Sequence, residues 1–386
     1  MSICVVVDAF PKLSETFVLD QVEGLRRRGH RVEVLCNRVT VPGCGRPHWG
    51  PLSGLRPLLS RLPLRAGHRF RRALDRLDGS FLSEFDVVLA HFGYEGARIA
   101  DLAAHRPGLP PLVTIYHGHD VATVHHDGGL SLYGTLFREG AAHLPVNDRF
   151  RGMLVEAGAP RARTRVNHMG IDLSRFRFAA RDWTARPLRL LSVCRLTEKK
   201  GIGDAIAALD ILQKELPDLD WSYDIVGGGE LAARLRMQVR ESSVSRRITF
   251  HGPLPHREVH RLLTRCHLFL LPSVVAGNGD AEGIPVSLME AMATGAVAVS
   301  TYHSGIPELM ENGVSGLLAP ERDPRALASL LRGVAADPKG LALMARRGRA
   351  TIETGFDAQR QLDLLEAELR LASRRPDRAA PCLARA

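Results

Sequence analysis

Short β-rich runs alternate with helical segments along most of this chain, and that alternation restricts its fold more than any other feature. Residues 2–10, SICVVVDAF, predict a buried strand, and residues 15–30 predict a helix with one apolar face. Gly29 ends that helix, and RVEVLC, residues 31–36, predicts the next strand. Strands joined by helices in this order form parallel sheets. The sequence therefore predicts an α/β fold.

The apolar periodicity lapses once, across residues 174–187, and the same alternation then resumes. At 386 residues the chain is long enough for two domains of ordinary size. We therefore expect two facing Rossmann-like domains, residues 1–180 and 181–372, with an inter-domain cleft and a flexible tail at 373–386. Ligands of open parallel sheets bind beyond the carboxyl ends of the strands. The loops expected to face the cleft are 8–16, 91–96, 117–127, 195–201, 227–230 and 273–285.

The composition is that of a soluble globular enzyme, with 45% apolar and 24% charged residues. No apolar run approaches the roughly 18 residues that a membrane-spanning helix needs. Residues 1–10 lack the basic flank and small-residue cleavage site of a secretory signal. We therefore expect a cytoplasmic protein. The six cysteines show no C-x-x-C spacing, so neither a disulfide framework nor a structural zinc site is indicated.

The net charge of +10 is concentrated in one segment, residues 55–77, which carries seven arginines and one acid with leucines between them. Such a segment suits peripheral binding to anionic lipid headgroups, so one expectation is membrane association there. The alternative is a solvated arginine-rich face, because Pro57 and Pro63 interrupt any continuous amphipathic helix. Nucleic-acid binding is disfavoured, since aromatic residues make up only 5% of the chain and do not interleave with the basic ones.

Two glutamates flank a predicted helix start in AEGIPVSLMEAMATG, residues 281–295. Pro285 suits the first helical position, so Glu282 falls in the preceding loop and Glu290 inside the helix. The free N–H groups and the dipole of a helix start attract an anion, and carboxylates accept hydrogen bonds from vicinal hydroxyls. A nucleotide sugar carries sugar hydroxyls, a diphosphate and ribose hydroxyls in that order. This arrangement therefore fits a nucleotide-sugar site, although the spacing alone is common among enzymes.

Cations are predicted at the same edge of the second sheet. In CRLTEKKG, Arg195 ends a predicted strand, and Lys199 and Lys200 lie in the loop after it, although a solvated basic turn is the alternative. A departing nucleoside diphosphate must be neutralised by a metal or by fixed cations. The only D-x-D sequence, residues 218–220, lies at the wrong end of its predicted strand to hold a metal there. We therefore expect a site without a metal or other cofactor.

Other candidate residues lie at predicted strand ends and turns. His117 clusters with His119 and Asp120, which favours a functional histidine over a structural one. His91 ends another predicted strand and is a candidate for the acceptor side. The glycines expected to let the backbone approach a base or ribose are Gly227 and Gly228.

Several motifs together resemble the retaining glycosyltransferases of family 4, which have the GT-B fold of two Rossmann-like domains. These motifs are EGIPVSLMEAMATG, RLTEKKG, VGGGEL and NHMGIDLSRF. The N-terminal FPKLSETFVLDQVEGLRRRGHRVEVL, with AHFG at 90–93 and HGHD at 117–120, is similar to the colanic-acid and exopolysaccharide branch. The resemblance spans residues 1–335 or thereabouts.

The resemblance implies roles for particular residues. Glu290 binds the donor ribose, Glu282 faces the transferred sugar, and Arg195 and Lys200 bind the diphosphate. Backbone N–H groups of Gly283 and Ile284 touch the sugar, and His117 approaches the reaction centre. The chain departs from many relatives in its first loop, where PKLSET replaces paired glycines. The residues expected on the acceptor side are Ser14, Glu15, Thr16, His91 and Asp120.

These expectations together predict an enzyme that moves a hexosyl or aminohexosyl group from a nucleotide sugar, most simply a UDP-sugar, to an acceptor hydroxyl with retention of configuration. The acceptor belongs to exopolysaccharide or lipid-linked glycan synthesis. A soluble natural product, such as an aminocyclitol antibiotic precursor, is the alternative acceptor. Two further classes stay open: a GT-B phosphorylase or sugar-nucleotide epimerase, and a non-catalytic, charge-driven binding protein.

Overall fold

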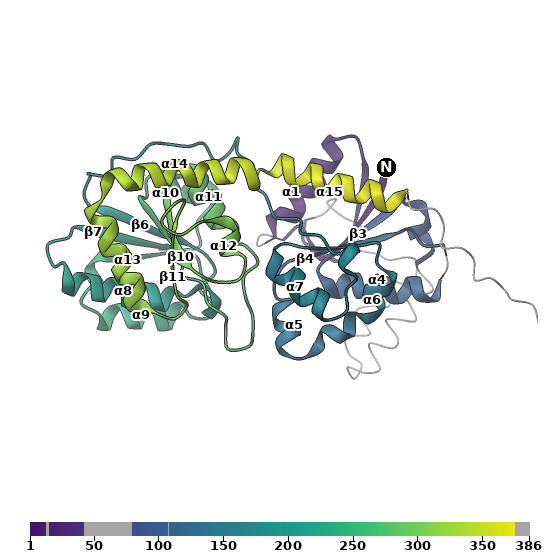
Figure 1. Ribbon diagram of the computed structural model, residues 1–386, viewed down its shortest axis with the longest axis horizontal. Coiled ribbons are helices and arrows are strands. Elements are labelled where there is room, and N and C mark those ends of the chain that lie inside the picture. Colours follow the sequence, from purple (N-terminus) through teal and green to yellow (C-terminus); the bar gives the residue numbers. More distant parts are fainter. Residues whose placement is uncertain (13–14, 42–78, 107, 375–386) are drawn as a thin grey trace, which may run out of the picture.

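The computed structural model describes residues 1–12, 15–41, 79–106 and 108–374. Two α/β domains lie side by side, each built on one parallel sheet (Figure 1). The predicted fold class is therefore confirmed. The segment 55–77 and Ser14, for which lipid and acceptor contacts were predicted, lie outside the described residues.

The sheet of the first domain has the strand order β2-β1-β3-β4-β5, and all its pairings are parallel. Ile3 pairs with Val32 on one side and with Val87 on the other, so the apolar run of β1 has a strand on both sides. The strands are β1 (Ser2–Phe10), β2 (Arg31–Val39), β3 (Val87–His91), β4 (Leu112–Tyr116) and β5 (Ala142–Pro145).

Helices cover this sheet through apolar faces of helical spacing. Val18, Val22 and Leu25 of α1 (Thr16–Arg27) are buried, as the pattern of the sequence predicts. The other helices of the first domain are α4 (Gly93–His105), α5 (Ala122–His126), α6 (Gly134–Glu139) and α7 (Asp148–Glu156). Short 3-10 helices are η2 (Gly79–Glu84), η3 (Gly129–Tyr133) and η4 (Arg161–Arg163).

The sheet of the second domain has the order β11-β10-β9-β6-β7-β8 and is also parallel throughout. Its strands are β6 (Leu188–Val193), β7 (Trp221–Val226), β8 (Ile248–Gly252), β9 (Leu268–Leu270), β10 (Val297–Thr301) and β11 (Leu317–Ala319). The helices that pack on it are α8 (Ile202–Glu215), α9 (Ala232–Glu241), α10 (His256–Leu263), α11 (Val286–Thr294), α12 (Ile306–Leu309), α13 (Pro324–Ala336) and α14 (Pro338–Gly355), with 3-10 helices η5 (Glu198–Lys200) and η6 (Ser245–Arg247).

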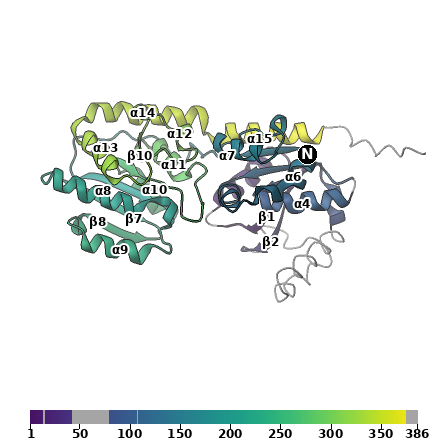
Figure 2. The ribbon, with the colours of Figure 1, turned by 60° about the horizontal axis from the view of Figure 1, so that its bottom comes forward.

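The chain passes between the domains twice, and the two passages run side by side. Ile171 forms a parallel bridge with Asp357, and the N–H of Ile171 donates to the carbonyl of Phe356 at 3.0 Å. After the second passage, α15 (Ala358–Ser373) lies along the first domain, as the yellow helix of Figures 1 and 2 shows. All of α15 but its last residue falls within 181–372, yet the contacts of α15 are with α1, β3 and β4. Ser373 is part of this helix, and residues 375–386 are outside the described part.

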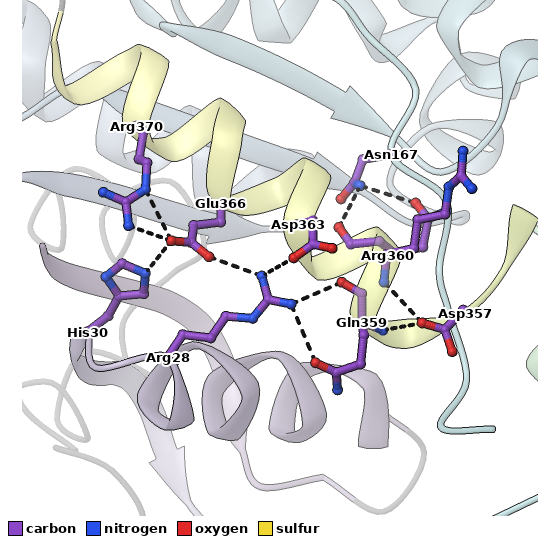
Figure 3. Close-up of polar contacts among 10 residues, drawn as sticks. Arg28, His30, Asn167, Asp357, Gln359, Arg360, Asp363, Glu366 and Arg370 are labelled. Carbon is purple, nitrogen blue, oxygen red and sulfur yellow. Dashed lines mark hydrogen bonds and ion pairs between the residues drawn. The ribbon is translucent and has the colours of Figure 1, made fainter. Parts of the chain in front are cut away.

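Polar contacts fix α15 to the end of α1 (Figure 3). The guanidinium of Arg28 lies 2.6 Å from the carboxylate of Asp363 and 3.0 Å from that of Glu366. Glu366 also pairs with His30 at 3.1 Å and with Arg370 at 2.6 Å. Hydrogen bonds from Arg370, then from Arg28 and His30, lower the pKa of Glu366 to about 2. This cluster and the buried leucines of α15 place the C-terminal helix on the first domain.

No helix within the described ranges is long and apolar enough to cross a bilayer.

Candidate active site

The loops after β4 and before α11 bring the two domains into contact. A Cβ added at Gly283 would lie 2.6 Å from the carbonyl oxygen of His117, and one added at Gly118 would lie 3.3 Å from the carbonyl of Ala281. No side chain fits at Gly283 without moving this backbone. His117 of the first domain and the Glu282 loop of the second, which the sequence assigned to one site, therefore lie together.

Glu282 and Lys200 form an ion pair in the second domain, next to the Gly283 turn that contacts His117. The Lys200 Nζ lies 2.8 Å from the Glu282 Oε1, and both side chains are nearly buried. Lys199 pairs with Asp280 at 3.0 Å instead, and its Nζ lies 3.9 Å from Glu282. The structure thus separates the two lysines, with Lys200 on the Glu282 side and Lys199 on the Asp280 side. Arg195 is exposed and makes no side-chain hydrogen bond or ion pair to any residue that the structure describes.

A left-handed glycine positions Lys200. Gly201 has a φ of +63°, and a Cβ there would lie 1.8 Å from the carbonyl oxygen of Pro272. No other residue fits this turn, which ends η5 and begins α8. The turn directs Lys200 toward the loop that carries Glu282.

The two lysines keep Glu282 ionised. Burial opposes ionisation of this carboxylate, but the charges of Lys200 and Lys199 outweigh it, so the pKa of Glu282 lies below its ordinary value. A buried carboxylate with adjacent ammonium groups can accept hydrogen bonds from sugar hydroxyls, and the ammonium groups can bind phosphate oxygens. The carboxylate thus suits the sugar of a glycosyl phosphate, and the ammonium groups suit its phosphate.

His303 and Glu321 support the Glu282 loop, and sequence reasoning missed both. The backbone N–H of Glu282 donates to His303 Nε2 at 3.0 Å, and His303 Nδ1 lies 2.6 Å from the Glu321 carboxylate. The other Glu321 oxygen accepts from the N–H of Val275 at 2.8 Å. His303 is completely buried. The pattern YHSGIPE offered a signal, a histidine two residues after a buried strand, but its partner lies 18 residues further along the chain.

Glu290 lies inside α11, as predicted, and the helix begins at Val286, so that Pro285 is its N-cap. Burial raises the pKa of Glu290 to about 7, while Arg175 lowers it and Asp20 of α1 raises it. Glu290 therefore faces charged groups of the first domain and of the linker. The N–H groups of Gly283 and Ile284 find no acceptor in the described part of the chain, which leaves them free for an anion at the helix start.

His91 was predicted on the acceptor side, and the structure corrects this. Its side chain is completely buried, and its Nδ1 lies 3.1 Å from Nε2 of His117. Burial lowers the pKa of His91 to about 3 and that of His117 below its ordinary value, so both rings are neutral at pH 7. The end of β3 directs the His91 side chain into the interior of the first domain. His91 therefore contacts His117 from the interior side.

Asp120 was also predicted on the acceptor side, and it too points inward. It is completely buried, and its carboxylate accepts hydrogen bonds from the N–H groups of Gly93 at 2.8 Å, His117 at 3.0 Å and Gly118 at 2.8 Å. Three backbone donors occupy the carboxylate. Asp120 therefore fixes the loop that carries His117.

The remaining acceptor candidates lie at the start of α1. Thr16 is exposed, and Glu15 forms an ion pair with Lys12. Phe17, the next residue in sequence, packs on the His117 ring with centroids 4.6 Å apart. Glu15 and Thr16 hence lie near His117 in the fold, and they remain candidates.

The glycines after β7 have a structural explanation. A Cβ at Gly227 would lie 1.8 Å from the carbonyl oxygen of Cys194, where φ is +132°. This close approach is to the loop that carries Arg195, so Gly227 is required by packing, whereas a ligand approach was predicted. A Cβ added at Gly228 would approach only Pro253, at 3.5 Å. Gly228 therefore stays a candidate for donor contact.

Asn147 links the two domains directly and was not foreseen. It is completely buried, its Oδ1 caps α7, and its Nδ2 donates to the carbonyl of Gly283 at 3.1 Å. The next N–H, that of Asp148, donates to the carboxylate of Glu308 at 2.9 Å. These bonds hold the Gly283 turn against the first domain.

Among residues 1–12, 15–41, 79–106 and 108–374, no group of three or more His, Cys, Asp and Glu side chains is arranged to hold a metal ion.

The architecture is similar to that of solved glycosyltransferases. Anabaena Alr3699/HepE, crystallised in complex with UDP and glucose, has a TM-score of 0.73 at 19% identity, over 96% of this chain and 100% of that chain. The lipopolysaccharide outer core galactosyltransferase WaaB has a TM-score of 0.73 at 16% identity, over 96% and 99%. These similarities show the fold. The two facing α/β domains, each on a parallel sheet, have the GT-B fold.

Sequence similarity places the chain within that class. The model for Glycosyltransferase Family 4 matches residues 14–175, and that for Glycosyl transferases group 1 matches residues 176–351. The amylovoran biosynthesis glycosyltransferase AmsK of Erwinia amylovora is 40% identical over 73% of this chain and 70% of its own length. The putative colanic acid biosynthesis glycosyltransferase WcaL of Escherichia coli K12 is 36% identical over 91% and 95%. The chain belongs to glycosyltransferase family 4, in the branch of these two proteins.

Proposed function

We propose that this enzyme transfers a hexosyl or aminohexosyl group from a UDP-sugar to a hydroxyl of a glycan acceptor, with retention of configuration, during exopolysaccharide or lipid-linked glycan assembly. The names of the amylovoran and colanic acid relatives support the pathway. The UDP and glucose in the Anabaena structure support the donor.

The observation that carries the proposal is the Lys200–Glu282 ion pair at 2.8 Å, set beside the contact of Gly283 with His117. A fixed cation and an ionised carboxylate adjoin free N–H groups at the start of α11. A glycosyl diphosphate needs the cation and the N–H groups for its phosphates and the carboxylate for its sugar. An acceptor bound to the first domain would reach the sugar where Gly283 contacts His117. A purely structural ion pair would not require the free N–H groups.

In the proposed reaction, the bond between the anomeric carbon and the leaving phosphate oxygen breaks, and a bond from the acceptor oxygen forms on the same face. The acceptor proton passes to the leaving phosphate oxygen. Arg195 and Lys200 neutralise the departing diphosphate, and Glu290 accepts hydrogen bonds from the ribose. Neutral His117 and ionised Glu282 orient the sugar. Since the leaving oxygen acts as the base, no protein nucleophile is needed.

Protein cations replace a metal in this proposal. Lys200 and Arg195 supply two positive charges at the end of β6, which is the role that a divalent ion has in metal-dependent transferases. The reaction is therefore proposed to need no cofactor beyond the nucleotide-sugar substrate.

The test is incubation with a panel of UDP-sugars, with and without glycan acceptors. We expect UDP release that depends on acceptor, and a product whose anomeric configuration by NMR equals that of the donor. An inverted product would contradict retention. Sugar 1-phosphate from glycan and phosphate would indicate a phosphorylase, and an epimerised UDP-sugar without acceptor would indicate an epimerase.

Peripheral binding to anionic membrane through residues 55–77 is part of the proposal, with the enzyme on the cytoplasmic side. It rests on the seven arginines of that segment. Sedimentation with liposomes that contain or lack anionic lipid tests it. We expect binding to the anionic vesicles alone, and equal binding to both would contradict it.

A further inference from the structure

Aromatic side chains form a continuous cluster that leads away from His117. The Phe92 ring lies 4.6 Å from the His117 ring and stacks on Tyr94 at 5.4 Å with a 7° angle between the planes. His119 lies 5.7 Å from both Phe92 and Tyr94. The sequence pattern singled out His119 only as a neighbour of His117, and the proposed mechanism does not use the other aromatic rings.

The backbone beneath the cluster is strained. Phe92 has a φ of +73°, a conformation that side chains other than glycine rarely adopt. Its N–H donates to the carbonyl of Ile115 at 2.8 Å, and the next N–H, of Gly93, donates to Asp120 at 2.8 Å. A Cβ at Gly93 would lie 2.7 Å from the Tyr133 ring. The surrounding contacts thus force the turn that aligns Phe92 with Tyr94.

The outer members of the cluster are accessible. Phe92 is 5% exposed, whereas Tyr94 is 38% exposed and His119 is exposed. One face of the Tyr94 ring packs on Phe92, so the accessible area lies on the rest of the ring. An accessible aromatic ring offers an electron-rich face to polarised C–H groups, which line the apolar face of a pyranose.

Carboxylates lie near Tyr94, and two of them are paired with cations, Glu15 with Lys12 and Glu95 with Arg98. Burial raises the pKa of the Tyr94 phenol, and the carboxylates of Asp120, Glu95 and Glu15 raise it further. Two cations against three carboxylates leave no excess positive charge to bind an anionic ligand, so the surroundings suit a neutral or amino sugar. The diphosphate side of the site, with Lys200, has the opposite charge.

We propose that Tyr94 and His119 form the acceptor subsite, on which the terminal neutral or amino sugar of the acceptor glycan stacks, with its reactive hydroxyl toward His117. This inference rests on the proposed function and names the class of acceptor. Phe92 and Asp120 are positioning residues that hold the two rings in place.

Kinetics with varied acceptor test the subsite. For Tyr94→Ala we expect the acceptor KM to rise about tenfold while the donor KM stays unchanged, because a stacked ring contributes about this factor. Tyr94→Phe keeps the stacking face and should stay within about twofold of the wild type. Met237→Ala, an exposed apolar residue of α9 in the other domain, is the control. An unchanged acceptor KM in both Tyr94→Ala and His119→Ala would overturn the subsite.

A binding measurement separates this subsite from the proposed reaction. Saturation-transfer NMR uses methyl β-galactoside, methyl β-glucosaminide and methyl β-glucuronide as probes. We expect transfer to the ring C–H protons of the first two that is lost in Tyr94→Ala, and little transfer to the glucuronide. Equal transfer in wild type and variant, or no transfer to any probe, would contradict the subsite. Failure of the proposed function appears differently, as no UDP release from any donor by the wild type.

Discussion

At the scale of single residues, Glu290 combines a proposed binding role with a cost in stability. Its pKa is raised by burial to about 7, so the folded protein keeps a proton there that the unfolded chain releases near pH 4.5. The stabilisation of the folded protein by this bound proton is complete below pH 4.5 and is lost as pH rises through about 7. Glu290→Gln should therefore stabilise the ligand-free enzyme at pH 8. Urea unfolding at pH 5 and 8 measures this, and equal effects at both pH values would contradict it.

Donor binding should show the opposite preference at Glu290. An ionised carboxylate accepts hydrogen bonds from the ribose better than a protonated one, so UDP affinity should fall as pH drops below about 7. In Glu290→Gln, UDP affinity should be lower and nearly independent of pH in this range. Calorimetric titration of UDP from pH 6 to 8 checks the prediction, and the same pH dependence in both proteins would refute it.

Residue types identified much of the candidate site from sequence, but not which way side chains point. Glu282, Lys200 and His117 carry charge or titrate, and the structure has them where their motifs place them: His117 after a strand, Lys200 in the loop after another strand, and Glu282 in the loop before α11. His91 and Asp120 share those features, yet hydrogen bonds to His117 and to backbone N–H groups turn them inward. Gly227 likewise contacts Cys194 of its own domain. Such partners lie far away in sequence, so no local pattern reveals them.

At the scale of elements, His303 and Glu321 hold the loop before α11. His303→Phe removes the acceptor for the Glu282 N–H and should lower kcat about tenfold, since the carboxylate proposed to face the sugar loses its fixed position. His303→Gln keeps an acceptor oxygen and should recover part of that loss. His251, which pairs with Asp224 at 2.6 Å outside the site, provides the matched control His251→Phe. Steady-state rates and melting temperatures together distinguish the effect from unfolding; rates unchanged in His303→Phe would contradict it.

The strand and helix elements follow from sequence because the periods of two and 3.6 residues are local properties. The domain on which α15 packs does not follow from the local sequence. The apolar stripe of α15 predicts a helix with one buried face, but nothing in residues 358–373 says which domain covers that face. The paired passages at Ile171 and Asp357 return the chain to the first domain, and this follows only from the fold.

At the scale of the whole molecule, α15 should stabilise the first domain although it follows the second in sequence. Leu365 is completely buried, while its neighbour Leu364 is 49% exposed. Leu365→Ala should lower the free energy of unfolding by about 2–4 kcal/mol, and Leu364→Ala by less than about 0.5 kcal/mol. Denaturant unfolding measures both. Equal effects would show that α15 does not pack as described.

The proposed reaction depends on the whole molecule because the cations lie in one domain and His117 in the other. Turnover with and without EDTA, in wild type and Lys200→Ala, tests most directly whether protein cations carry the charge of the leaving diphosphate. Lys214→Ala, which removes a surface lysine paired with Asp210, is the control. We predict full wild-type activity in EDTA and a loss of about 10²–10³-fold in kcat for Lys200→Ala, the effect of removing one charge-stabilising group. Activity that disappears in EDTA and returns with manganese would contradict the account.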